Sequence, residues 1–425
     1  MSEIVKYLPP AAIPEGGAPD WKTADADRWR AARVPAVLGP VAGGWILLPL
    51  VLLAIALRAV GDPTTEGVGT AWDGYPAAVL LLALPAWYRF LPAATVVSVP
   101  LIALEAVTGP FRPAEADAVG RAGIGVTLAL GAFALTGALL RLRSRRLQRA
   151  LVLEAAGDAR SPVPDHLPDG HRHRGRWPIL AGALLCTAAA ALLVRGLCQD
   201  LGAPPGQPYD ASGQQVMALL LFAPGSPLLG RGLQARRAAR RLHDGQQPVL
   251  RVGVRHRHSD TNWIVADART TTAPPLVAFR DRFEDGYRSG SGRTLVGGPE
   301  ERLRTEHHDI DETSEPYEAV LYGVPCEGAE VLLEYAVYEG GSRIVSKVTA
   351  APLMPFRRHG CRRWSPAGTS YAVRRAEEAK RRREERASSS ASSSSSSSGC
   401  GSSSSCSSCS SCSSSCGGGC GGGGD

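Results

Sequence analysis

The chain lacks the short motifs that identify several large classes of enzymes. It contains no Gly-x4-Gly-Lys-Ser/Thr phosphate loop, no Gly-x-Ser-x-Gly nucleophile elbow and no His-Glu-x2-His metalloprotease motif. The glycine-rich stretch Arg288–Arg293 is not a strand-to-helix turn, so it is a poor phosphate site. These absences favour a protein that is not an enzyme.

Lysine is scarce, and long stretches carry no charge at all. The formal net charge of +7 comes largely from arginine. Val34–Leu57 is an uncharged run of 24 residues, and about 20 apolar residues suffice for a helix to cross the hydrocarbon layer. Arginines flank this and similar runs, a pattern that indicates membrane topology rather than nucleic-acid binding. We therefore expect a polytopic α-helical membrane protein.

Six stretches are candidates for membrane spans, four in a membrane domain at 34–140 and two at 177–230. They are Val34–Leu57, Gly74–Tyr88, Phe90–Leu104, Ala122–Leu140, Trp177–Val194 and Ala211–Gly230. The second and third have 15 residues each, so a re-entrant pair is the alternative to two spans. The sixth contains the breaker cluster Pro224–Pro227, and we do not expect a helix to run straight through it.

Arginine is concentrated in three of the segments that flank these stretches, at 28–33, 141–149 and 231–241, whereas the other loops are richer in acidic residues. The positive-inside rule then predicts six crossings of the cell membrane, with both termini in the cytoplasm. No charged residue lies in the middle of a stretch, which disfavours a transporter.

The remaining segments predict one soluble domain. Residues 1–33 are polar and rich in proline, so we expect disorder there, and 141–176 form a cytoplasmic loop. A basic juxtamembrane segment at 231–243 leads into a β-rich domain at 244–364. Its alternating runs predict a small antiparallel barrel or sandwich with strands at Pro248–Val254, Asn262–Ala268, Leu276–Phe279, Glu318–Val324, Ala329–Tyr338 and Arg343–Thr349. Its charges are balanced, which argues against nucleic acid. A charged helical linker follows at 365–386, and then a disordered Ser/Gly/Cys-rich tail at 387–425.

The tail contains the sharpest chemical pattern. Four cysteines have the spacing C-x2-C-x2-C-x3-C, namely Cys406, Cys409, Cys412 and Cys416. This spacing resembles the run that holds an iron–sulfur cluster in bacterial ferredoxins, but Gly417 follows it instead of proline and no apolar residues are available to shield a cluster. Thiolates at this spacing also suit zinc or copper(I). We expect a compositionally biased tail without a fixed cofactor, and metal or thiol chemistry is the alternative.

Two further groups of residues are candidate sites. Histidines occur in the pairs His171/His173, His256/His258 and His307/His308, for which solvated loop side chains are the expected outcome and a metal site the alternative. A basic cluster with flanking aromatics suits an anionic lipid surface, with a solvated linker as the equal alternative; it comprises Arg357, Arg358, Arg362 and Arg363.

The layout resembles uncharacterised integral membrane proteins of actinobacteria. These share Ala/Arg-rich spans and a C-terminal tail of Ser, Gly and Cys, here Ser413–Asp425. The resemblance implies no activity for particular residues. Our leading hypothesis is a non-enzymatic membrane scaffold or interaction protein. The second is a metal- or redox-responsive membrane protein that uses the tail thiols, and the third is a small transporter.

Overall fold

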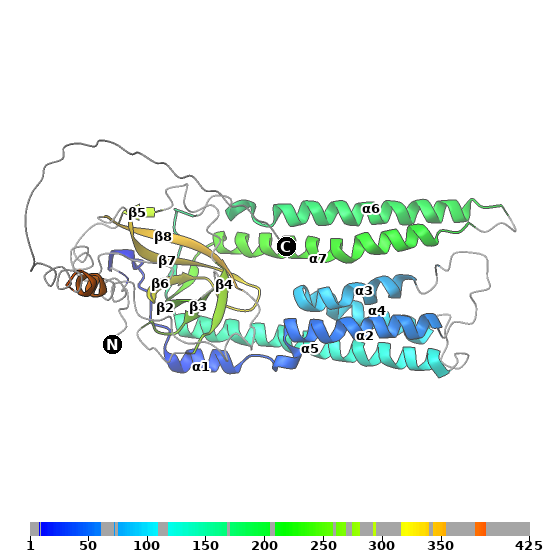
Figure 1. Ribbon diagram of the computed structural model, residues 1–425, viewed down its shortest axis with the longest axis horizontal. Coiled ribbons are helices and arrows are strands. Elements are labelled where there is room, and N and C mark those ends of the chain that lie inside the picture. The colour runs from blue at the N-terminus through cyan, green and yellow to red at the C-terminus, as the bar shows by residue number, and fades with distance from the viewer. Residues whose placement is uncertain are drawn as a thin grey trace, which may run out of the picture. The chain divides into compact units, whose positions relative to one another are not determined.

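The computed structural model describes residues 8, 10–60, 72, 75–108, 118–167, 171–204, 209–257, 261–268, 274–280, 292–294, 316–339, 343–353 and 379–387. The chain divides into two compact units, Met1–Arg374 and Arg375–Asp425. The first combines a helical membrane domain with an antiparallel sheet, as expected (Figure 1). In the second, residues 379–387 form a helix in which Lys380 pairs with Glu384 and Arg381 with Glu385, at 3.9 and 3.6 Å.

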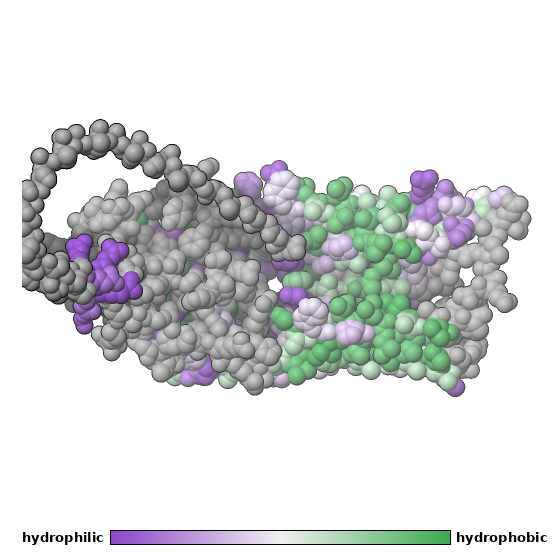
Figure 2. All heavy atoms as spheres, viewed as in Figure 1, coloured by the Kyte–Doolittle hydropathy of each residue, from purple (hydrophilic) through white to green (hydrophobic). Residues whose placement is uncertain are grey.

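Four helices are long and apolar enough to cross a membrane. They are α2 (Pro40–Val60), α5 (Ala118–Ala156), α6 (Arg176–Leu201) and α7 (Ser212–His243). Their outer surface forms an apolar band with polar residues at each end (Figure 2). The protein is therefore embedded in a membrane. Between α2 and α5 lie α3 (Tyr75–Phe90) and α4 (Pro92–Thr108), which have 16 and 17 residues and are joined by Leu91 alone.

Helix α7 runs without interruption through Pro224 and Pro227, so the predicted break is wrong. Helix α7 stays continuous because it packs very closely against α6. A Cβ atom added to Gly182 would lie 2.3 Å from the backbone nitrogen of Leu229, and one added to Gly225 would lie 2.8 Å from the Cβ of Leu185. Backbones packed this tightly hold a helix together where proline removes a hydrogen bond. Helix α5 also extends past Leu140 to Ala156, so the expected loop at 141–176 begins as helix.

The N-terminal segment differs from the expected disorder. Pro10–Ala12 form the short helix η1, and Thr23–Ala31 form α1. Trp21 and Trp29 are each 2% exposed and pack edge to face with ring centroids 5.7 Å apart. The indole of Trp29 donates a hydrogen bond to the Pro325 carbonyl at 3.0 Å. Two large apolar rings thus anchor a segment that its proline content alone would leave unfolded.

All six predicted strands are present. They are β2 (Gln247–Arg257), β3 (Thr261–Val265), β4 (Val277–Arg280), β6 (Tyr317–Tyr322), β7 (Glu330–Glu339) and β8 (Arg343–Pro352). With the unpredicted β5 (Gly292–Thr294) they follow the order β4-β3-β2-β6-β7-β8-β5, every pair antiparallel. An isolated bridge joins Phe279 to Leu353, so the sheet curves into a half-barrel. A two-residue strand β1 (Arg160–Ser161) pairs with β2.

The core of this half-barrel recruits residues from outside the expected 244–364 domain. Trp29 of α1, Val152 and Ala156 of α5, and Leu242 of α7 belong to the same buried cluster as the strand residues. We call the sheet together with these covering segments the β domain. It is continuous with the ends of two membrane helices, α5 and α7.

Candidate functional site at the junction of helices and sheet

A short turn of the β domain meets the ends of the membrane helices. Residues 323–329 connect β6 to β7, and we call them the junction turn. Gly323 and Gly328 have φ angles of +104° and +75°, a backbone region that suits glycine and that lets the chain reverse in few residues. Between them the turn presents Pro325, Cys326 and Glu327 to the helices.

Glu327 accepts hydrogen bonds from two arginines of α5. Its Oε1 lies 2.7 Å from Arg141 Nη2 and 3.3 Å from Arg145 Nη2. Arg141 is only 1% exposed. Burying a guanidinium is costly unless a counter-charge lies close to it, and Glu327 supplies this charge.

Arg141 also bonds the end of α3. It donates hydrogen bonds to the carbonyls of Tyr88 and Arg89, the latter at 3.2 Å. Carbonyls in the last turn of a helix lack partners within that helix, so a cation placed there is favourable. Arg141 therefore connects three elements, namely α5, the C-terminal end of α3 and the junction turn.

Tyr88 fills the space behind Arg141. The guanidinium carbon lies 5.3 Å from the centre of its ring, and the Tyr88 hydroxyl donates to the Leu38 carbonyl at 2.7 Å. Two glycines make room for this ring. A Cβ on Gly43 would lie 2.4 Å from its Cε1, and one on Gly137 would lie 2.2 Å from its hydroxyl oxygen. The contact between α2, α3 and α5 therefore tolerates no extra atom here.

A second polar cluster lies at the start of β7. His171, in the short helix η3 (His171–His173), is 5% exposed and places Nε2 2.9 Å from Glu330 Oε1. Its Nδ1 lies 3.1 Å from Nε2 of His243, at the end of α7. Arg174 forms an ion pair with the same carboxylate. Because both ring nitrogens of His171 are engaged, this imidazole orders its neighbours rather than offering an open ligand.

Cys326 is the only thiol in the junction turn. It is half-buried, and burial raises the pKa of this thiol, with Glu327 adding to the increase and Arg145 and Arg149 opposing it. A raised pKa keeps the group protonated at neutral pH, which makes it a poor nucleophile. The junction is thus built from charged side chains that pair with one another, an arrangement that suits a structural connection between the β domain and the membrane helices.

No protein-family model, curated protein or solved structure matches this chain. The geometry of the junction therefore carries the functional argument.

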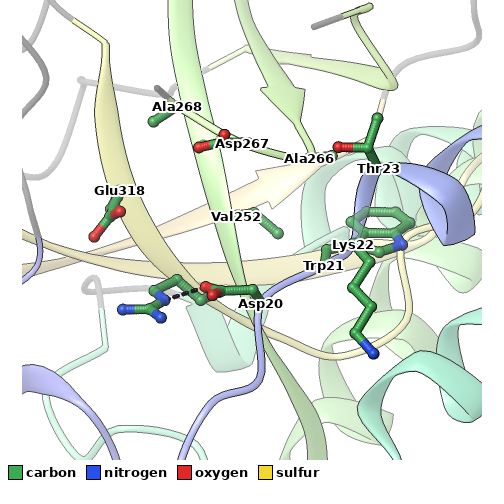
Figure 3. A pocket seen from close by; sticks show the side chains of 11 residues that line it. Asp20, Trp21, Lys22, Thr23, Val252, Ala266, Asp267, Ala268 and Glu318 are labelled. Atoms are coloured by element: carbon green, nitrogen blue, oxygen red, sulfur yellow. Dashed lines mark hydrogen bonds and ion pairs between the residues drawn. The ribbon is translucent and has the colours of Figure 1, made fainter. Parts of the chain in front are cut away.

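A separate pocket of about 190 Å³ lies beside the N-terminal segment on the β domain (Figure 3). The carboxylate of Asp20 pairs there with Arg251, while Glu318 accepts a hydrogen bond from the backbone nitrogen of Leu8 at 3.2 Å. Ligand sites usually occupy about 300–1,000 Å³, so this pocket is small. These polar contacts fasten the N-terminal segment to β2 and β6.

Most of the predicted site residues lie outside the described residues. These are Cys406, Cys409, Cys412, Cys416, Arg357, Arg358, Arg362, Arg363, His258, His307 and His308. Their metal, redox and lipid roles stay predictions. Within the described part of the chain, no group of three His, Cys, Asp or Glu residues is placed to hold a metal ion.

The pair His171/His173 separates in the structure. His171 is buried in the polar cluster, whereas His173 is exposed. Sequence reasoning missed Glu327, Glu330 and His243 because their partners are distant in the chain and form no motif. Arg141 was recognised, but only as a topology marker.

Proposed function

We propose that this protein is a six-span scaffold or interaction protein of the cell membrane, that it is not an enzyme, and that it holds its β domain as a rigid cytoplasmic platform for protein partners. The observation that carries the proposal is the pair between Glu327 and the buried Arg141, at 2.7 Å. This contact bonds the β domain directly to a membrane helix.

The convergence of contacts on one segment supports a rigid platform. Residues 323–330 form hydrogen bonds or ion pairs with Trp29 of α1, with Arg141 and Arg145 of α5, and with His171 of η3. A module that acted independently of the membrane would need only a flexible linker. Rotation of the β domain against the helices would separate Glu327 from Arg141 and leave a buried guanidinium without its counter-charge, which opposes such a movement.

The positions of the helix ends support the six-span topology. Residues preceding α6 and residues at the ends of α5 and α7 all contact the β domain, as does Arg33 ahead of α2, which donates to the Leu276 carbonyl. The chain therefore returns to the same side after α5 and again after α7. At 1.5 Å per residue, α3 and α4 are about 24 and 26 Å long, close to the roughly 30 Å hydrocarbon layer. The arginines near the ends of α5 and α7 support a cytoplasmic β domain.

Labelling with a membrane-impermeant maleimide tests the topology. Cys198, exposed near the end of α6, should react in intact cells, and mass spectrometry of the peptides separates it from other cysteines. Cys326 should react only after the membrane is permeabilised. Labelling of Cys326 in intact cells would contradict a cytoplasmic β domain.

Site-specific photo-cross-linking tests the scaffold role. A photoreactive amino acid at the exposed position 246 of the β domain should give covalent adducts with proteins in living cells. The same residue at position 184, where Leu184 is exposed on the membrane helix α6, should react with lipid alone and is the matched control. If the exposed positions of the β domain yield no protein adduct, the scaffold proposal fails.

A further inference from the structure

Helix α7 continues well past the hydrocarbon layer. At 1.5 Å per residue, its uncharged part, Ser212–Gly230, is about 28 Å long, which is close to the roughly 30 Å of that layer. The neighbouring helix α6 indicates the same level, because Gly232 packs against Gly175 and the 81% exposed Trp177 follows two residues later. Exposed tryptophan is typical of the boundary between membrane and water. The last part of α7, which begins at Arg231, therefore lies outside the apolar layer.

One side of this last part consists of exposed arginines. Gly232, Ala239 and Leu242 are buried and form the opposite side of the helix. With 3.6 residues per turn, four exposed arginines fall within one arc of about 140° around the helix axis. We call these residues the arginine face, and they are Arg236, Arg237, Arg240 and Arg241.

The arginine face has no counter-charge in the part of the chain that the structure describes. None of its four side chains forms an ion pair or a hydrogen bond with another described residue. Arg236 and Arg240 are four residues apart, as are Arg237 and Arg241, and like charges at this spacing repel one another on a helix. The exposed Asp244, which follows the helix, forms no ion pair with them either. An anion from outside the chain would neutralise this excess of positive charge.

The distance of the arginine face from the apolar layer decides which anion fits it. Lipid headgroups extend about 5–8 Å beyond the hydrocarbon on each side of a bilayer. Measured along the helix axis from Arg231, the backbone of Arg236 lies roughly 8 Å away, whereas Arg240 and Arg241 lie roughly 14 and 15 Å away. The far half of the face thus projects beyond the headgroups. An anion that contacts the whole face must come from the aqueous phase.

We propose that the arginine face binds an acidic segment of a soluble partner protein, an inference that rests on the proposed scaffold role and names the chemistry of the partner. A guanidinium pairs with a carboxylate through two parallel hydrogen bonds, so the face suits a segment with several Asp or Glu residues. Nucleic acid fits less well, because proteins that bind it typically neutralise more phosphates than four arginines can. The exposed position 246 follows the end of α7 closely, so a partner on the face can also reach the β domain.

Fluorescence anisotropy with an acidic peptide tests the arginine face. The probe is a labelled peptide of alternating Glu and Ser, added to the full-length protein in phosphatidylcholine nanodiscs, and a neutral probe has Gln in place of Glu. Arg240→Gln/Arg241→Gln should weaken binding of the acidic probe about tenfold, which corresponds to about 1.4 kcal/mol for two exposed charge pairs. Arg240→Lys/Arg241→Lys keeps the charge but not the paired donors, so the loss should be smaller.

The matched control is Arg143→Gln/Arg146→Gln, which removes the same charge from two exposed positions of α5 and should leave binding unchanged. An equal loss in both double glutamine variants would show general electrostatic attraction and overturn the proposal, as would equal binding of the two probes. Tighter binding of a labelled oligothymidylate than of the acidic probe would assign the face to nucleic acid. Preferential retention of phosphatidylglycerol in native mass spectrometry, abolished by Arg240→Gln/Arg241→Gln, would assign it to lipid headgroups. Unchanged thermal unfolding of each variant excludes misfolding as the cause.

Photo-cross-linking from position 246 separates this inference from the scaffold role. Protein adducts should decrease in Arg240→Gln/Arg241→Gln and stay unchanged in Arg143→Gln/Arg146→Gln. If adducts form and persist in the first of these variants, the scaffold role stands and the arginine face is overturned. If the unmodified protein forms no adducts from its β domain, the scaffold role itself fails, whatever the acidic probe binds.

Discussion

The β domain is fastened to the membrane helices in two chemically different ways. On the side of α5, the contact is a guanidinium–carboxylate pair between Arg141 and Glu327. On the side of α6 and α7, it is a chain of imidazoles, His243 to His171, that ends on Glu330. The first contact is a direct ion pair between two side chains, whereas the second runs through a hydrogen bond between two imidazole rings.

Removing the carboxylate of the first contact should have the largest effect. Glu327→Gln leaves Arg141 buried without a counter-charge, and we expect the free energy of unfolding to fall by about 3–5 kcal/mol. Thermal unfolding in detergent, with hydrogen exchange of the junction turn, measures the loss. The control is Glu154→Gln, in the pair between Arg28 and Glu154 whose side chains are 55% and 61% exposed. This control should change little, because water screens exposed pairs. Equal effects would refute the special role of the buried pair.

Removing the central imidazole should have the next largest effect. His171→Ala takes one hydrogen-bond partner each from Glu330 and His243, and we expect a loss of about 2–3 kcal/mol because polar groups inside the cluster are left unsatisfied. His173→Ala, two residues away and exposed, is the control. Hydrogen exchange at the start of β7 should rise in the first variant alone. Protection that survives His171→Ala would mean that Arg174 by itself holds Glu330.

Crowding the ring behind Arg141 should have a smaller effect. Gly137→Ala places a methyl group against the Tyr88 hydroxyl, and we expect a destabilisation of about 1–2 kcal/mol from this overpacking. Gly125→Ala, on the same helix, has no atom within 4 Å of the new methyl group and should leave the melting temperature unchanged or slightly higher. Similar melting temperatures in both variants would show that the ring can move aside.

The thiol of the junction turn should show the smallest effect, a difference in rate. Because its pKa is raised, Cys326 holds less thiolate at neutral pH than an ordinary cysteine, and it should react with iodoacetamide more slowly than the exposed Cys198. Its rate should increase as the pH rises through the raised pKa. Glu327→Gln removes one cause of the increase and should accelerate the reaction. Faster labelling of Cys326 in the unmodified protein would contradict a closed junction.

Local sequence patterns predicted the elements of this fold well. The alternation of apolar residues identified all six main strands. Long uncharged runs identified the membrane helices. These signals work because neighbours in sequence are neighbours in space within a strand or helix.

Contacts between distant segments were not predictable in the same way. Arg141 and Glu327 are separated by 186 positions, and nothing near either residue indicates the other. Proline and glycine suggested disorder for residues 1–33, but Trp21 and Trp29 are buried by strands that come much later in the chain. Likewise, the tight glycine packing against α6 that keeps α7 intact is a property of two helices together.

The N-terminal segment also dictates an order of assembly. Its backbone bonds to β2, where Trp21 donates to the Arg251 carbonyl and Arg251 donates to that of Pro19. During synthesis from the N-terminus, all of the membrane helices are made before this strand exists. The N-terminal segment therefore cannot pair with β2, or bury Trp21 and Trp29 against the sheet, until the membrane helices have been synthesised. Pairing of this segment with β2 can occur only after the whole membrane domain has been made. A chain truncated before residue 251 would leave both rings exposed to chaperones and proteases.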